Sequence, residues 1–190
     1  MEETKATAVH YTINARASRF SVRASACGVL SAFGHNPTIA IRDFTGEVQV
    51  NPDQVEESWL RMTVKVASLG VTDDISDKDR REIERQMYED VLEVSKYPEI
   101  VYECTGLSAS KTGEGQYRLT LNGDLTLHGV TRKQAISAQA TLSGETLVAF
   151  GDFSLSQTDY EIRLVSALGG ALKVKDEVKG LFHFVARKQE

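Results

Sequence analysis

Four histidines are the residues of this 190-residue chain best suited to acid–base or metal chemistry, and they stand far apart in the sequence. His10, His35, His128 and His183 show none of the spacings with which imidazoles usually share a metal ion. His35 and His128 both lie in glycine-containing turns, so they could cap a ligand or meet in space. A structural or solvated role for both imidazoles is the alternative.

The sequence contains no motif that indicates catalysis or a cofactor. It has no H-E-x-x-H, C-x-x-C or Walker sequence, and Gly113-x-Gly115 lacks the third glycine of a dinucleotide fingerprint. Ser31, between Gly28 and Gly34, does not have the spacing of a nucleophile elbow. We therefore expect no catalytic residue, no metal ion and no cofactor.

The charge balance excludes some classes of partner. With 22 Lys and Arg against 27 Asp and Glu, the net charge is -5, whereas binding to nucleic acid or to an anionic membrane needs clustered basic residues. Residues 71–93 hold 9 acids and 4 bases, and thus the whole negative excess, which predicts a solvated surface element there. We expect one domain over residues 1–190, with its core at about 9–186, and no nucleic-acid partner.

No segment of the sequence predicts an integral membrane segment. The longest stretch without Asp, Glu, Lys or Arg covers 18 residues, 24–41. It contains Gly34 and Pro37, and it would leave the polar side chains of His35 and Asn36 in hydrocarbon. The first residues are acidic and lack the apolar region of a secretory signal. We expect a cytoplasmic protein, or a periplasmic one if the chain is a mature form.

Alternation of apolar and polar residues dominates the chain and predicts antiparallel strands, each with one buried face. Such alternation occurs in five segments: 19–25, 60–67, 117–121, 136–142 and 181–187. Turn sequences rich in glycine lie between many of these segments. Many antiparallel strands with only 3 prolines predict a closed barrel or a sandwich.

Asn122-Gly123 allows two interpretations of the chain around it. The pair is typical of a two-residue hairpin turn. Its flanks also fit one long bulged strand that turns later, at His128-Gly129. We favour the long strand.

The acidic segment is the stretch with helical periodicity. Ser76 followed by Asp79 resembles a capping box, with Asp in place of the usual Glu. Tyr97-Pro98 prevents continuation, because the residue before a proline avoids the helical region. We predict one amphipathic surface helix over about residues 77–94, docked through a narrow apolar seam. The apolar residues of this seam recur every four positions: Ile83, Met87 and Val91.

The apolar stripes mix bulky side chains with small ones, which affects how the interior can pack. The small residues are Ala24, Ala26, Ala138 and Ala140. A core of normal density needs large side chains on facing positions, so small ones leave volume. In an eight-stranded barrel that volume is enough for one small or elongated ligand. Tight packing of a sheet or helix against these alanines is the alternative.

Several segments together resemble the YceI-like, polyisoprenoid-binding family. The similarity extends over about residues 9–186, with the segments in the family's order. Glu161 stands where the family usually has glycine, and residues 34–37, GHNP, are similar to only a subset of members. Four segments carry the resemblance: 123–132 (GDLTLHGVTR, against the family's GdLTlHGvT), 92–100 (LEVSKYPEI), 153–160 (FSLSQTDY) and 174–178 (VKDEV).

The resemblance implies an all-β, lipocalin-like fold: an extended barrel of eight antiparallel strands around an apolar tunnel, with the helix of residues 77–94 inserted. Members are often dimeric, so a homodimer is a possible assembly. The occupant would be a long isoprenoid or other long-chain lipid, of the quinone or prenyl phosphate type, held for sequestration, transport or storage. Burial of an aliphatic chain contributes ~0.8 kcal/mol per CH₂, so binding needs hardly any polar contact and leaves no motif.

On this hypothesis the tunnel is lined by apolar residues, most of them in the alternating segments. His35, His128 and Tyr160 are weaker candidates, for a polar mouth. One alternative is a small barrel enzyme, a hydrolase or isomerase, with His35 or His128 as general base. Another is an interaction module whose acidic helix docks a basic partner. The expected lining residues are Phe20, Val22, Met62, Val64, Leu119, Leu121, Phe153, Phe182 and Phe184.

Overall fold

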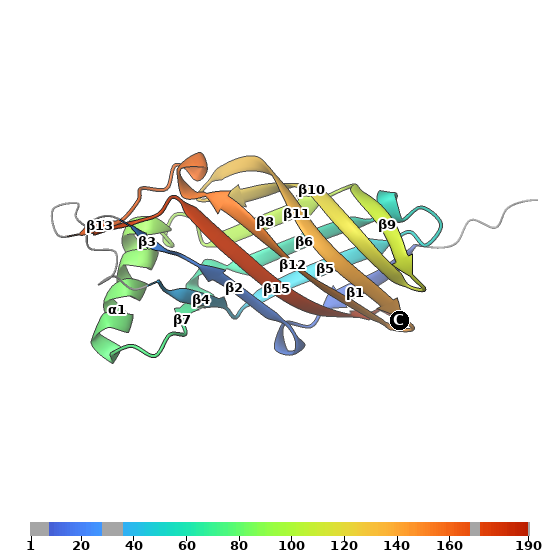
Figure 1. The fold of residues 1–190 in the computed structure, drawn as a ribbon, viewed down its shortest axis with the longest axis horizontal. Helices are drawn as coiled ribbons and strands as arrows, with labels where there is room; N and C mark the ends of the chain where they lie inside the picture. The colour runs from blue at the N-terminus through green and yellow to red at the C-terminus, as the bar shows by residue number, and fades with distance from the viewer. Residues whose placement is uncertain (1–7, 28–35, 168–171, 190) are drawn as a thin grey trace, which may run out of the picture.

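The predicted barrel is confirmed by a computed structural model, which describes residues 8–27, 36–167 and 172–189. Figure 1 shows an elongated barrel with helix α1 (Asp77–Gln86) at one end. The strands are β1 Val9–Ile13, β2 Arg19–Arg23, β3 Ala26–Cys27, β4 Thr38–Ile41, β5 Phe44–Val50, β6 Trp59–Lys65, β7 Leu69–Val71, β8 Glu99–Cys104, β9 Leu107–Gly113, β10 Gln116–Leu127, β11 Val130–Ser143, β12 Thr146–Ser156, β13 Ser166–Ala167, β14 Leu172–Val174 and β15 Glu177–Lys188.

Antiparallel pairing closes the barrel. Within the described residues, β1 pairs with both β5 and β15, which closes a ring of eight strands in the order β1, β5, β6, β8, β10, β11, β12 and β15. β9 continues the path of β8 along the same side of β10. Because every strand of the ring has two partners, its backbone polar groups are satisfied without an open edge.

At the end that carries α1, the sheet leaves the ring and forms an edge. There β15 pairs with β2, β2 with β4, and β4 with β7. Side chains of α1 cover the edge strand β7: Glu84 Oε1 accepts the N–H of Val71 at 2.9 Å. Arg80 donates to the carbonyl oxygens of Val71 at 2.5 Å and Asp73 at 3.0 Å. The helix thus satisfies groups that an uncovered edge would expose to another chain.

The α-helix ends at Gln86, eight residues before the predicted end, and the π-helical turn that follows it ends at Val91, three residues before that end. Ser76 caps its N-terminus as expected, accepting the N–H of Asp79 at 3.1 Å. After Gln86 the chain widens into a π-helical turn, Met87–Val91, in which the N–H of Leu92 donates to the carbonyl of Met87 at 2.9 Å. Glu93 then takes a φ of 44°. That left-handed backbone ends the helix before Tyr97-Pro98 is reached.

The long strand predicted through Asn122-Gly123 is confirmed, with the bulge elsewhere. β10 pairs with β11 without a break from Gln116 to Leu127 and turns at His128-Gly129, while its irregularity lies at Gln116/Tyr117 against β9. A Cβ atom on Gly123 would lie 2.5 Å from both the carbonyl oxygen of Glu103 and the ring of Tyr102. Gly123 therefore serves close packing inside a strand.

In the part of the chain that the structure describes, no helix is long and apolar enough to cross a membrane.

Candidate ligand-binding site

Two apolar cavities lie in the barrel interior as the described residues form it. The first chamber, of about 350 Å³, lies between α1 and the strands at that end, and the second chamber, of about 120 Å³, lies deeper in the barrel. The nine apolar residues expected to line a tunnel all lie on their walls. Val22 and Val64 line the first chamber; Met62, Leu119, Leu121, Phe182 and Phe184 line the second; Phe20 and Phe153 line both.

The rings of Phe20 and Phe153 stand between the two chambers. Their centroids are 6.3 Å apart, and their planes meet edge to face at 65°. Phe20 is held from the other side by Phe44 and Phe184, at centroid distances of 6.0 and 5.5 Å. Edge-to-face packing at these distances is favourable for aromatic pairs, so the two rings form an ordered partition.

Two inward-facing glycines make room for the aromatic rings of β12 and β15. Phe153 pairs with Gly180 across these strands, and Phe182 pairs with Gly151. A Cβ atom on Gly180 would lie 2.2 Å from the Phe153 ring, and one on Gly151 would lie 2.8 Å from the Phe182 ring. Sequence reasoning missed both glycines. Their signal is a glycine inside an alternating strand, which often marks a close approach.

The small residues lie where the sequence predicts spare volume. Ala24 and Ala26 line the first chamber, and Ala138 and Ala140 line the second. Methyl side chains at these positions leave unfilled space inside the barrel, whereas larger ones would fill it. The positions of all four alanines therefore favour the cavity hypothesis over the alternative of tight packing.

The helical segment forms a wall of the first chamber. The expected apolar seam, Ile83, Met87 and Val91, faces the chamber, and so does Leu92. Both Val91 and Leu92 reach the chamber because the π-helical turn holds an extra residue. The segment thus combines the predicted surface helix with a role in closing the interior.

Polar side chains are few on the first chamber. The polar residues among the described ones that line it are Gln86, Gln157 and Lys173. Gln86 donates to Glu82 at 2.8 Å, and Gln157 donates to the carbonyl of Lys175 at 2.9 Å. Lys173 is exposed, and it carries the one charged group on the described wall. The chamber can therefore bury an apolar chain and present a cation to its polar end.

Two of the three candidates for a polar mouth, His128 and Tyr160, do not line either chamber. His35 lies outside the described residues. His128 is bound away from the interior, with Nε2 at 2.9 Å from Glu93 Oε2 and Nδ1 at 3.2 Å from the carbonyl oxygen of Tyr160. Tyr160 is 2% exposed and lines neither cavity wall. The mouth role predicted for His128 and Tyr160 is thus not supported by their positions, because both side chains are used in packing.

Three residues with a left-handed backbone conformation are His128 itself, its partner Glu93, and Glu161, which follows its partner Tyr160. Glu93, His128 and Glu161 have φ values of 44°, 52° and 57°. His128 with Gly129 forms the two-residue turn between β10 and β11, for which positive φ at both positions is required. Glu161 caps the short helix Gln157–Tyr160 in the left-handed conformation that glycine adopts readily, so glycine would fit this position as well.

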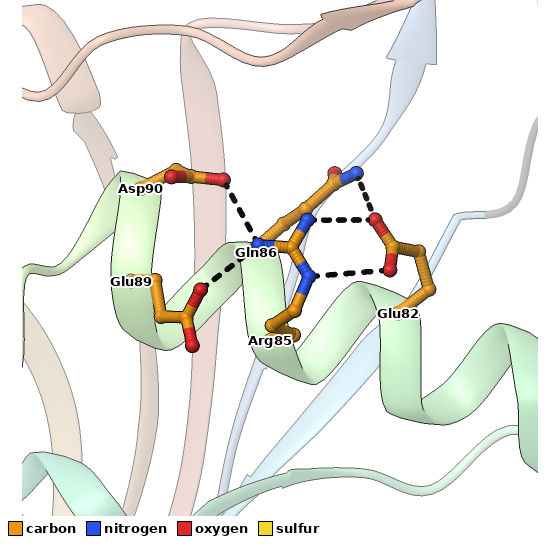
Figure 2. A network of polar contacts seen from close by, with 5 residues as sticks. All are labelled: Glu82, Arg85, Gln86, Glu89 and Asp90. Carbon is orange, nitrogen blue, oxygen red and sulfur yellow. Dashed lines mark hydrogen bonds and ion pairs between the residues drawn. The ribbon is translucent and has the colours of Figure 1, made fainter.

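The outer face of α1 carries paired charges (Figure 2). Arg85 lies 2.9 Å from Glu82 and from Glu89, and 3.8 Å from Asp90. Hydrogen bonds from Arg85, the larger cause, and from Gln86 hold the pKa of Glu82 below its ordinary value. These side chains are about half exposed or more, so the acidic segment is a solvated surface, as its charge predicts.

The fold and interior define a closed antiparallel barrel with an apolar cavity. The chain belongs to the family of YceI-like domains, whose model matches residues 11–186. Among curated relatives, a UPF0312 protein of Photorhabdus laumondii is 29% identical over 135 residues, and one of Ectopseudomonas mendocina is 30% identical over 129. The matches cover 71% and 61% of this chain but 59% and 62% of those proteins, so the chain spans about three fifths of their length.

Solved structures share the fold at low sequence identity. BcnA of Burkholderia cenocepacia superposes with a TM-score of 0.67 at 19% identity, covering 91% of this chain and 98% of that one. A polyisoprenoid-binding domain of Saccharophagus degradans, implicated in plant cell wall breakdown, gives a TM-score of 0.66 at 12% identity, covering 94% and 98%. These similarities confirm the lipocalin-like barrel.

Proposed function

We propose that this protein binds an isoprenoid-type lipid in its barrel, with the tail in the first chamber and the polar head at the end that carries Lys173. The observation that carries the proposal is the first chamber itself: about 350 Å³ of space whose described wall is apolar apart from Gln86, Gln157 and Lys173. Such a volume lies within the ~300–1,000 Å³ range of small-molecule sites. Sequestration, transport or storage of the lipid is the corresponding role.

Burial of the tail supplies the affinity. Each buried CH₂ group contributes ~0.8 kcal/mol, so a tail of several isoprene units binds without a network of polar contacts. Lys173 favours an anionic head over a neutral one, although an exposed charge contributes only ~0.2–1 kcal/mol. A prenyl phosphate fits this wall better than a quinone. The polyisoprenoid-binding domain of Saccharophagus degradans, which shares the fold, supports the ligand class.

In the part of the chain that the structure describes, the enzyme alternative finds no histidine or carboxylate at the cavity to act as general base. Among the described residues that line the two chambers there is no His, Asp or Glu, and His128 faces Glu93 and Tyr160 instead. A general base must lie within hydrogen-bond reach of the proton that it takes. The interaction-module alternative is also less favoured, because Arg85 pairs with three acids of the helical segment.

Native mass spectrometry of freshly purified protein, followed by lipid extraction, tests the proposal. We expect a bound apolar ligand, or uptake of farnesyl phosphate by the emptied protein at one molecule per chain. Protein that carries no lipid and takes up neither a prenyl phosphate nor an isoprenoid quinone would contradict it. Comparing farnesyl phosphate with farnesol measures the contribution of the head group.

A further inference from the structure

The partition between the chambers would limit the length of a bound lipid tail. This inference rests on the proposed function. We propose that the rings of Phe20 and Phe153 act as a stop, so that the lipid tail ends in the first chamber and does not enter the second. The two residues are then determinants of chain length. The ligand class that follows is a prenyl lipid of a few isoprene units.

The position of the two rings carries this inference. Among the described residues, Phe20 and Phe153 are the two that line both chambers, and their edge-to-face contact stands between the cavities. Phe20 is fixed by Phe44 and Phe184. Phe153 contacts Phe20 and packs closely over the backbone of Gly180. Both rings are therefore held by neighbours, and a tail can pass only if at least one of them turns away.

The dimensions of the first chamber set the expected length. Its wall includes Phe20, Val22, Ala24 and Ala26, which are successive inward positions on one stretch of chain. Six residues of extended chain span about 20 Å at ~3.3 Å per residue. The second chamber, at about 120 Å³, falls below the ~300 Å³ typical of small-molecule sites. The first chamber is thus the part of the interior with the size of a ligand site.

A series of alcohols tests the stop: geraniol, farnesol, geranylgeraniol and longer polyprenols, each bound in competition with a fluorescent apolar probe. For the wild type we expect the affinity to rise at least about tenfold per added isoprene unit while the tail fills the chamber, and then to level off. In Phe153→Ala the chambers merge, so the levelling should move to a chain longer by at least one unit.

Phe182→Ala is the matched control. Phe182 lies over Gly151 as Phe153 lies over Gly180, and it lines the second chamber alone. Its loss enlarges the second chamber and removes a neighbour of Phe20 and Phe184 but keeps both rings of the partition, so the wild-type length limit should remain. Phe153→Leu serves if Phe153→Ala does not fold, because it shortens the obstruction with a smaller loss of packing.

The outcomes separate the two proposals. A shift of the length limit in the Phe153 variant, with none in Phe182→Ala, supports the stop. The same limit in the wild type and in the Phe153 variant overturns the stop but leaves lipid binding intact. If the wild type binds none of the alcohols and no prenyl phosphate, lipid binding itself fails, and the stop fails with it.

Discussion

His128 and Glu93 join two turns that are 35 residues apart, through a contact of 2.9 Å between Nε2 and Oε2. The other ring nitrogen faces the carbonyl oxygen of Tyr160. Both partners are acceptors, so the doubly protonated ring donates to both, whereas the neutral ring donates to only one. Glu93 lies two residues after the helical segment that lines the first chamber. The contact therefore fixes a wall of the cavity to the barrel.

Replacing His128 by Asn should destabilise the protein by about 1–2 kcal/mol. Asn keeps the left-handed turn conformation but is too short to bridge Glu93 and Tyr160. His128→Ala should lose roughly a further 1 kcal/mol, because Ala tolerates positive φ poorly. Urea unfolding measures both. Lys96→Ala is the control, since it removes an exposed partner of Glu93 and should leave the free energy of unfolding nearly unchanged. Equal losses in the Asn and Lys96 variants would argue against the bridge.

The same cluster predicts a loss of stability in acid. Hydrogen bonds from Lys96, the larger cause, and from His128 hold the pKa of Glu93 below its ordinary value of 4.5. A carboxyl whose pKa is lower in the folded state stabilises the protein above the unfolded pKa, and this stabilisation is lost as the pH falls through the folded pKa. The difference in unfolding free energy between the wild type and Glu93→Gln should therefore shrink from about pH 5 downward. A difference that stays constant from neutral pH to below pH 3 would refute the linkage.

The glycines under the aromatic rings should resist substitution to different degrees. Gly180→Ala meets the Phe153 ring at 2.2 Å, whereas Gly151→Ala meets the backbone carbonyl of Ser137 at 2.2 Å as well as the Phe182 ring. Overpacking of this kind costs about 1–3 kcal/mol. We expect Gly151→Ala to be the more damaging, because a ring can turn and a strand carbonyl cannot. Gly106→Ala, whose nearest neighbour would be 3.7 Å away, is the control in thermal unfolding, and an equal fall in Tm for all three would contradict the packing.

Alternation in the sequence predicted strands β2, β6, β10, β11 and β15 and most of the residues expected to face the interior, whereas the ring of eight strands was implied by the family resemblance. It could not predict that Phe20 meets Phe153, because that contact depends on the pairing of Phe153 with Gly180 across two strands. A slip of one residue would turn every side chain to the other face. The His128–Glu93 contact was equally hidden, since it needs left-handed backbone at both residues, and neither is a glycine.

Val22→Trp should block the uptake of lipid while leaving the fold intact. Val22 lines the first chamber and is only half-buried, so an indole can occupy the space of the ligand without displacing packed core atoms. We expect the affinity for farnesyl phosphate to fall at least about tenfold, equivalent to ~1.4 kcal/mol, with a circular dichroism spectrum like that of the wild type. Val148→Trp places the same side chain on β12 at a position that lines neither chamber, and it should bind normally. Unchanged uptake by Val22→Trp would remove Val22 from the binding wall, and equal losses in both variants would point to a general defect of the barrel.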